Sequence, residues 1–284
     1  MSSIKDELFI AFQHCVPQHL LSRGAGYLAN CETSWVKNAL IKHFINHFRV
    51  DMSEAAQADY TQYANFNAFF TRELKPGARP IAEGNCVISP ADGAISQFGS
   101  IKDGRIFQAK GHDYTALELL GGRTKLARHF HDGFFTTIYL SPRDYHRVHA
   151  PISGTLAEMI YVPGKLFSVN TTTANNVPRL FARNERLICI FDTAIGKVAV
   201  ILVGALIVAG IETVWAGQIA PLLTTRVTTY STSQMVTLAK GDELGRFKLG
   251  STVILLFEKD RVQAKENFQA GLPLRMGEKL ARFA

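Results

Sequence analysis

The chain has 284 residues, of which 47% are hydrophobic and 19% are charged, and its formal net charge is +7. This composition supplies enough apolar residues for a substantial core and excludes an intrinsically disordered polymer. The positive balance favours anionic partners, and because the basic residues are scattered and form no nucleic-acid-binding module, anionic lipid is a better expectation than nucleic acid.

The first quarter of the chain, residues 6–70, has the pattern of helices. In residues 35–50, apolar side chains recur every three or four positions, and Lys, His and Arg occupy much of the remaining surface. A basic amphipathic helix suits an anionic membrane surface, whereas the more common use of such a pattern is docking of the apolar face on the core. The phenylalanines of residues 65–74 fit either use.

The character of the sequence changes after residues 75–80, KPGARP, which are rich in helix-breaking residues and predict a boundary. Beyond them, segments rich in Val, Ile, Phe and Thr show little alternation with helices. The sequence therefore predicts an α+β fold with a mostly antiparallel, β-rich core and an N-terminal helical segment. Strands are expected at residues 87–98, 134–140, 155–162, 186–193, 198–215, 234–239 and 252–257, and a short helix at 112–120.

The cysteines and the most apolar run exclude further classes. The cysteines have neither a Cys-x-x-Cys pair nor a zinc-type spacing with histidine, so we expect free thiols in a reducing compartment and no metal site. Residues 198–210 are too short for an ordinary spanning helix, and the N-terminal residues lack the apolar stretch of a secretion signal. If the protein meets a membrane, we expect it to lie on the surface. The four cysteines are Cys15, Cys31, Cys86 and Cys189.

Three short segments carry residues suited to chemistry. Taken alone, Asp92 before Gly is a turn signal, the three-residue spacing of His146 and His149 lacks the Glu of a zinc protease, and Ser251 lacks a nucleophile-elbow frame. Together, an Asp, a His and a Ser can form a constellation in which a carboxylate orients a base that deprotonates a serine. The segments are SPADG (89–93), YLSPRDYHRVHAP (139–151) and GRFKLGST (245–252).

These segments resemble the phosphatidylserine decarboxylase family. LGST at residues 249–252 resembles the self-processing site of that family, and further strings agree in the same order from about residue 66 to residue 257. Several long, unrelated strings in register make coincidence a poor explanation. The other agreeing strings are PADG, QAKGH (108–112), LSPRDYHRVH (140–149), YVPGKLFSVN (161–170), LFARNER (180–186) and the VGA…IETVWAG run (203–217).

The resemblance implies self-cleavage between Gly250 and Ser251. The Ser251 hydroxyl would attack the Gly250 carbonyl, and an N-to-O acyl shift followed by elimination and hydrolysis would leave a pyruvoyl group in place of the serine. His149 matches the base, and Asp92 matches the carboxylate that orients it. The glycine offers no side chain to obstruct the attack.

The same resemblance divides the chain into parts. Residues 1–74 would be a helical membrane-associating segment, and residues 75–284 a β-rich catalytic domain. Cleavage would give a large chain, residues 1–250, and a small chain, residues 251–284, that remain associated.

The pyruvoyl group would be a covalent cofactor that forms a Schiff base with the substrate amine and takes up the electrons freed by loss of carbon dioxide. The implied reaction is that of a carboxy-lyase in phospholipid biosynthesis, which converts phosphatidylserine in the membrane to phosphatidylethanolamine. His146 is a candidate to return a proton to the α-carbon, with ordering of its loop as the alternative, and Tyr139 and His112 are candidates to line the substrate cleft.

The lipid substrate favours membrane docking of residues 35–50. It implies peripheral attachment to the cytoplasmic face of the cell membrane. The sequence leaves open whether the chain forms a homodimer.

Two other classes of protein remain as alternatives. A serine hydrolase would use Asp92, His149 and Ser251 on an external substrate and would stay uncut. A non-enzymatic membrane-surface module would use the same motifs as turns and core. Ser251→Ala separates the three classes, because it leaves the decarboxylase uncut, abolishes turnover in the hydrolase and does nothing to the module.

Overall fold

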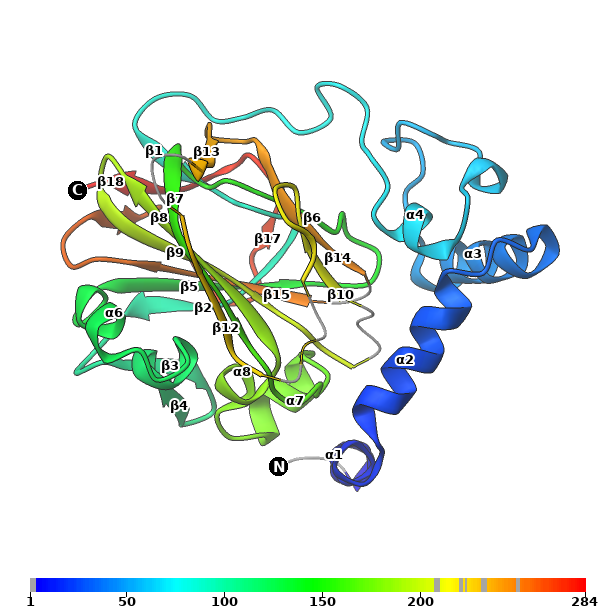
Figure 1. The fold of residues 1–284 in the computed structure, drawn as a ribbon, viewed down its shortest axis with the longest axis horizontal. Coiled ribbons are helices and arrows are strands. Elements are labelled where there is room, and N and C mark those ends of the chain that lie inside the picture. The colour runs from blue at the N-terminus through cyan, green and yellow to red at the C-terminus, as the bar shows by residue number, and fades with distance from the viewer. Residues whose placement is uncertain (1–3, 207–209, 220–221, 223, 231–233, 249–250) are drawn as a thin grey trace.

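The structure is a computed structural model of the chain that describes residues 4–206, 210–219, 222, 224–230, 234–248 and 251–284. The N-terminal part is helical, as predicted, and its long helices stand along one side of a β-rich body (Figure 1). The helical elements of this part are α1 (Ile4–Cys15), α2 (Gln18–Ala29), α3 (Ser34–Phe48), the 3-10 turn η1 (Tyr60–Gln62) and α4 (Phe66–Phe70).

The apolar face predicted for residues 35–50 is mostly turned inward. Ile41 on α3 is 0% exposed, and the ring of Phe44 meets that of Phe66 on α4 edge-on at 5.0 Å between centroids. The phenylalanines of α4 therefore cover α3, which makes packing the main use of this face. Large exposed apolar side chains instead lie mainly on α1 and α2: Ile4, Leu8, Phe12, Leu20, Leu21 and Leu28, with Trp35 at the start of α3.

Among the described residues, no helix combines the length and the apolar character that crossing a membrane requires.

One large antiparallel sheet forms the body of the molecule (Figure 1). Its strand order is β12-β7-β8-β9-β15-β5-β2-β17, with β13 also paired to β7. This arrangement confirms the predicted antiparallel, β-rich fold. The strands are β2 (Gly93–Ser100), β5 (Phe134–Leu140), β7 (Gly154–Val162), β8 (Arg186–Thr193), β9 (Gly196–Val203), β12 (Arg226–Thr229), β13 (Thr237–Leu238), β15 (Ser251–Phe257) and β17 (Pro273–Leu274).

Smaller elements complete the body. A four-stranded sheet has the order β11-β10-β14-β6, a three-stranded sheet has the order β1-β18-β16, and β3 pairs with β4. Their bounds are β1 (Cys86–Ile88), β3 (Arg105–Ala109), β4 (His112–Thr115), β6 (Arg147–His149), β10 (Gly210–Thr213), β11 (Gly217–Gln218), β14 (Glu243–Lys248), β16 (Val262–Ala264) and β18 (Lys279–Phe283). The short helices are α5 (Ala116–Leu119), α6 (Thr124–His129), α7 (Thr171–Asn176) and α8 (Leu180–Arg183).

The main sheet is buried on both faces. Along β15, Val253 and Leu255 pack in the cluster that includes the four-stranded sheet, whereas Ile254 and Leu256 pack in the cluster that includes helices α5 to α8. Side chains alternate between the faces of a strand, so a strand covered on both sides is apolar throughout. This explains why residues 252–257 were recognisable as a strand.

The remaining strand predictions differ mainly in length. Residues 134–140 and 186–193 are strands as predicted, but 87–98 is broken by a turn between β1 and β2, and β9 ends at Val203 within the predicted 198–215. The predicted helix at 112–120 is half wrong, because its first residues form β4 and Thr115 then caps α5.

Candidate active site

Ser251 is the first residue of β15, which lies between β5 and β9 in the main sheet. Its Cα partner on β5 is Leu140, and the next residue, Thr252, pairs with Val203 at the end of β9. Gly250 lies outside the described residues, and for Ser251 the backbone alone is described. The backbone register therefore puts the bond predicted to be cut at the end of a central strand.

Two acidic residues flank this position across the sheet. Val203 is followed by Gly204, whose N–H donates to the carbonyl oxygen of Glu185 beside β8. On the opposite side, Asp92 directly precedes β2, the strand beyond β5. Because neighbouring strands are about 4.8 Å apart, the backbones of Asp92 and Glu185 lie roughly 10 Å from that of Ser251 in opposite directions.

Asp92 is a buried carboxylate held by a cation and a backbone N–H. Arg79 donates from Nε to Oδ1 at 2.8 Å and from Nη2 to Oδ2 at 2.6 Å, and the Met276 N–H donates to Oδ1 at 2.8 Å. Arg79 also donates to Glu54 at 2.8 Å. The ion pair with Arg79 and the Met276 hydrogen bond hold the Asp92 carboxylate in one position beside the central strands.

The position of His149 on β6 gives its imidazole two different partners. Nδ1 lies 2.8 Å from the carbonyl oxygen of Gly241, and Nε2 lies 3.0 Å from the hydroxyl of Tyr145. A carbonyl can only accept, so Nδ1 carries the proton and Nε2 accepts from the tyrosine. Burial lowers the pKa of His149, although the Gly241 hydrogen bond opposes that shift. The ring is therefore neutral at pH 7 and able to act as a base.

The direct contact expected between Asp92 and His149 is not part of this geometry. Both ring nitrogens of His149 are engaged by other groups, and Asp92 is bound to Arg79 and Met276. In the described structure the imidazole is oriented by Gly241 and Tyr145, and Asp92 acts on it through its negative charge, which raises the His149 pKa.

His146 is fully buried and is held by contacts with α4 and with its own loop. It is 0% exposed, its ring stacks on Phe70 at 4.0 Å between centroids, and its Nε2 lies 3.1 Å from the Ser141 carbonyl oxygen. Burial, together with the charge of Arg72, lowers its pKa to about 3. A neutral ring that is hydrogen-bonded to Ser141 of its own loop agrees with the alternative role, in which His146 orders that loop.

Beside Asp92 lies a cavity of about 590 Å³, and Tyr139 and Tyr145 form part of its wall. Tyr139 therefore lines a cavity, and its role in binding substrate stays a prediction. His112 pairs with Ala109 across the β3–β4 hairpin and lines neither this cavity nor the one beside Glu185. Its predicted place in the cleft therefore has no support from the described residues.

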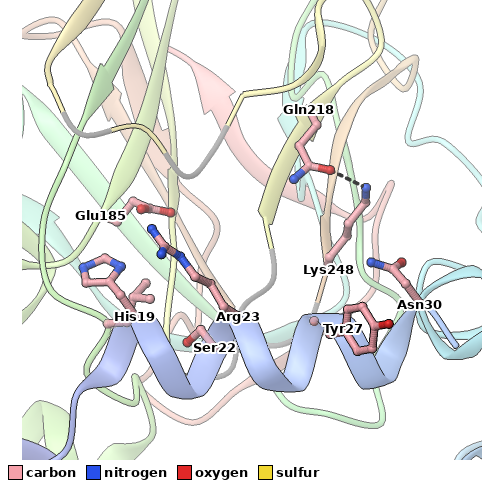
Figure 2. Close-up of a pocket in the computed structure, with 10 residues that line it drawn as sticks. His19, Ser22, Arg23, Tyr27, Asn30, Glu185, Gln218 and Lys248 are labelled. Atoms are coloured by element: carbon pink, nitrogen blue, oxygen red, sulfur yellow. Dashed lines mark hydrogen bonds between the residues drawn. The ribbon is translucent and has the colours of Figure 1, made fainter.

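A second cavity, of about 270 Å³, lies beside Glu185. Figure 2 shows His19 and Arg23 of α2 turned toward Glu185, and Lys248 hydrogen-bonded to Gln218. Glu185 is 3% exposed, and its Oε2 accepts a hydrogen bond from Tyr161 at 2.8 Å.

Sequence reasoning missed Glu185, Arg79 and Tyr145 as site residues. Each lies within a string already noted, LFARNER, KPGARP or LSPRDYHRVH, but nothing in these strings gives the partner of each side chain. A buried acid or base beside a cavity is recognisable only once the chain is folded.

Comparisons with known proteins agree over almost the whole chain. Residues 66–282 match the family described as phosphatidylserine decarboxylase, and residues 8–49 match a second family described as PSD. The chain is 57% identical over 282 residues to a protein of Pseudomonas fluorescens, with 98% of each chain covered. It is 57% identical over 283 residues to one of Azotobacter vinelandii, covering 98% of this chain and 99% of the relative. A Pseudomonas aeruginosa protein is 58% identical over 284 residues, with 98% of each chain covered. Each of the three is named phosphatidylserine decarboxylase proenzyme.

Proposed function

The chain belongs to the phosphatidylserine decarboxylase family, and on that basis we propose that it cuts itself between Gly250 and Ser251 and then decarboxylates phosphatidylserine to phosphatidylethanolamine. The observation that carries this proposal is the position of Ser251 at the first residue of a central strand, between two buried carboxylates. A bond at the end of a strand can be cut without breaking the hydrogen bonds within it.

In the proposed cleavage, the Tyr145 hydroxyl leaves Nε2 of His149, and this nitrogen accepts the proton of the Ser251 hydroxyl as the serine oxygen adds to the Gly250 carbonyl carbon. The C–N bond then breaks while the nitrogen takes up a proton, and an ester joins the two residues. Elimination releases the Gly250 carboxylate and leaves dehydroalanine, whose hydrolysis releases ammonia and leaves the pyruvoyl group. The neutral state of His149 suits it to the first of these steps.

The surrounding sheet fits a chain end at residue 251. β15 is paired along its whole length with β5, and from Thr252 onward with β9, both in the large chain. The small chain also supplies β16, β17 and β18, of which β17 pairs with β2 and β18 pairs with β1. These pairings support the proposal that the two chains stay associated after the cut.

Once formed, the pyruvoyl group would supply the electron sink for the electron pair that stays on the α-carbon when carbon dioxide leaves. Around it, we assign Asp92 the role of a fixed negative charge that holds the loop before β2 in place. Tyr139 would form part of the wall that excludes water from the reacting atoms. His146 is assigned to ordering its loop, because a buried imidazole with a pKa of about 3 is a poor proton donor at neutral pH.

We further propose that the protein attaches peripherally to the cytoplasmic face of the cell membrane, where it acts in phospholipid biosynthesis. The exposed apolar side chains of α1 and α2, such as Leu8 and Leu20, support insertion among lipids. The net charge of +7 supports attraction to anionic headgroups.

The test is release of carbon dioxide from vesicles that contain phosphatidylserine. The purified protein should convert this lipid to phosphatidylethanolamine, and Ser251→Ala should remain uncut and inactive. A wild-type protein that stays uncut and reacts with serine-directed probes would favour the hydrolase alternative. Turnover by the Ser251→Ala variant would exclude the proposed mechanism.

A further inference from the structure

Helix α2 presents two different faces. Its positions along the second cavity recur at helical spacing, so they form one continuous face. The opposite side carries Leu21 and Leu28, which are 43% and 49% exposed, and Leu20, which is 66% exposed, lies between the two faces. One helix therefore offers an apolar surface outward and a polar surface inward. The positions on the cavity side are His19, Ser22, Arg23, Gly26, Tyr27 and Asn30.

Two charged groups of the cavity, Glu185 and Arg23, have no ion-pair partner among the described residues. On the inner wall, the carboxylate of Glu185 is buried, and no Arg or Lys within the described part of the chain forms an ion pair with it. On the outer wall, Arg23 is exposed and has no hydrogen-bond or ion-pair partner among the described residues. Lys248 also lines the cavity and already has partners, since it pairs with Glu212 at 3.3 Å and donates to Gln218 at 2.9 Å. Figure 2 shows these groups around a common space.

The cavity also adjoins the residue that would become the pyruvoyl group. Lys248 ends β14, only three residues before Ser251, so their Cα atoms are at most about 11 Å apart. Glu185 lies two strands from Ser251 in the main sheet. A small molecule in this cavity is therefore within reach of position 251.

We propose that this cavity binds the headgroup of phosphatidylserine, with the phosphodiester on Arg23 and Lys248 and the ammonium group toward Glu185. The inference rests on the proposed function and extends it by naming the headgroup site. The headgroup carries a phosphodiester, a carboxylate and an ammonium group. Arg23 and Glu185 offer the opposite charges for the phosphodiester and the ammonium group, and Lys248, although paired with Glu212, adds a second cation nearby. A guanidinium matches a phosphodiester in shape as well as in charge.

The orientation of α2 agrees with such a ligand. With its leucines in the bilayer, the polar face of the helix lies at the depth of the headgroups and borders the cavity. The larger cavity beside Asp92 is also lined by arginines, of which Arg79 and Arg275 pair with Glu54. Substitution of Arg23, which lines only the smaller of these two cavities, therefore distinguishes the two candidate sites.

Binding is measured first, on uncut protein that carries Ser251→Ala, because the described structure is of the continuous chain. The ligands are dihexanoyl phosphatidylserine and dihexanoyl phosphatidylglycerol below their micelle concentrations, so that bilayer docking does not contribute. Arg23→Gln should weaken binding of both lipids about tenfold, the loss of one charge-assisted contact. Arg23→Lys should recover part of that loss. The matched control is Lys5→Gln on α1, which removes one exposed charge from the same helical segment and should change neither affinity.

Glu185→Gln separates the ammonium from the phosphodiester. It should weaken phosphatidylserine about tenfold and leave phosphatidylglycerol unchanged, because the latter has no ammonium group. Wild-type affinity of Arg23→Gln for both lipids would overturn the proposal. Equal weakening of both lipids by Glu185→Gln would overturn the assignment of the ammonium to that residue.

The second measurement is the steady-state kinetics of the self-cleaved enzyme with the soluble lipid, which gives KM and kcat. Arg23→Gln should raise KM about tenfold with kcat within twofold, because the residue binds the headgroup and does not touch the bond that breaks. If the wild-type protein binds phosphatidylserine as described but releases no carbon dioxide, the proposed function fails and the headgroup site stands. If it decarboxylates normally and Arg23→Gln has an unchanged KM, the headgroup site fails and the function stands.

Discussion

Asp92 and Glu185 lie on opposite sides of Ser251, each about two strands away. Both are buried, but their hydrogen-bond and ion-pair partners differ. Asp92 receives three hydrogen bonds from Arg79 and one from the Met276 N–H. Glu185 has a hydrogen bond from Tyr161, and burial raises its pKa.

The difference suggests two roles: Asp92 is held by its own cation, whereas Glu185 is left to interact with a cation from outside the protein. An acid with a cation built beside it has a fixed charge and fixed position, whereas a buried acid without one is stabilised by whatever cation arrives. The side of the sheet with Asp92 also holds His149, the candidate base for self-cleavage. We therefore connect Asp92 with the cut and Glu185 with the substrate.

The largest expected contrast is between Asp92→Asn and Glu185→Gln. Asp92→Asn should slow self-cleavage about 100-fold, in the range of general-base effects, because the charge beside His149 is lost. Glu185→Gln should cleave within twofold of the wild-type rate. The measurement is the fraction of uncut chain with time on denaturing gels. Equal slowing by both substitutions would abolish the distinction between the two carboxylates.

Asp92→Asn should also lower the free energy of unfolding by about 3–5 kcal/mol, because Arg79 is left buried with half of its partners. The matched control is Asp113→Asn, which breaks the exposed pair with Arg105 and should cost less than about 1 kcal/mol. Both are read from urea unfolding. A small loss for Asp92→Asn would mean that the Arg79 pair is not a structural one.

The pH dependence of cleavage gives the next contrast. Since the folded pKa of His149 is below its ordinary value of 6.5, the rate should be level at and above pH 6.5. It should fall about tenfold per pH unit once the pH drops below the folded pKa, where the base becomes protonated. Asp92→Asn should move the fall to lower pH, because Asp92 raises the His149 pKa. Glu185→Gln should leave the pH at which the rate falls unchanged. A profile centred above pH 7 would exclude His149 as the base.

On the Glu185 side, Tyr161→Phe removes the hydrogen bond to Oε2 and should raise the Glu185 pKa further. We expect a loss of about 1 kcal/mol in unfolding free energy and a three- to fivefold weaker affinity for dihexanoyl phosphatidylserine. The comparison variant is Tyr145→Phe, next to His149, which should change the rate of cleavage and not this affinity. If Tyr161→Phe slowed cleavage and Tyr145→Phe weakened lipid binding, the roles assigned to Glu185 and His149 would have to be exchanged.

The smallest effect on turnover is expected from His146→Phe, which should change kcat less than twofold. A proton donor at this position would instead cost about 100-fold or more. Because the folded pKa of His146 is about 3 and its ordinary value is 6.5, the unfolded chain binds more protons between these values. Wild-type stability should therefore fall as the pH drops through this window, and the variant should lose less. Parallel acid unfolding curves would contradict the buried, neutral imidazole.

Much of the fold follows from local pattern. The apolar run of β15 and the Val- and Ile-rich β8 were recognisable because both faces of the main sheet are buried. By contrast, β6 and β14 were missed, since short strands with Arg, His and Glu lack an apolar pattern. For residues 35–50, nothing in the local sequence reveals that α4 covers much of the apolar face, so its packing could not be predicted. Docking of this segment on a membrane stays a prediction.

In the candidate site, too, some features could be predicted from the sequence and others could not. Ser251, His149 and Asp92 were found through motifs, but their hydrogen-bond partners were not. His149 meets Gly241, which is 92 residues away, and Asp92 meets Met276 at a separation of 184 residues. Such contacts depend on the register of distant strands, which no local pattern encodes.

The denatured mass of freshly purified protein is the most direct test of self-cleavage. We expect two species in place of one, corresponding to residues 1–250 and 251–284, with the smaller one blocked to N-terminal sequencing and carrying a reactive ketone. Ser251→Ala should give a single chain. A wild-type protein that remains one stable species near 31.4 kDa would contradict self-cleavage and the mechanism built on it.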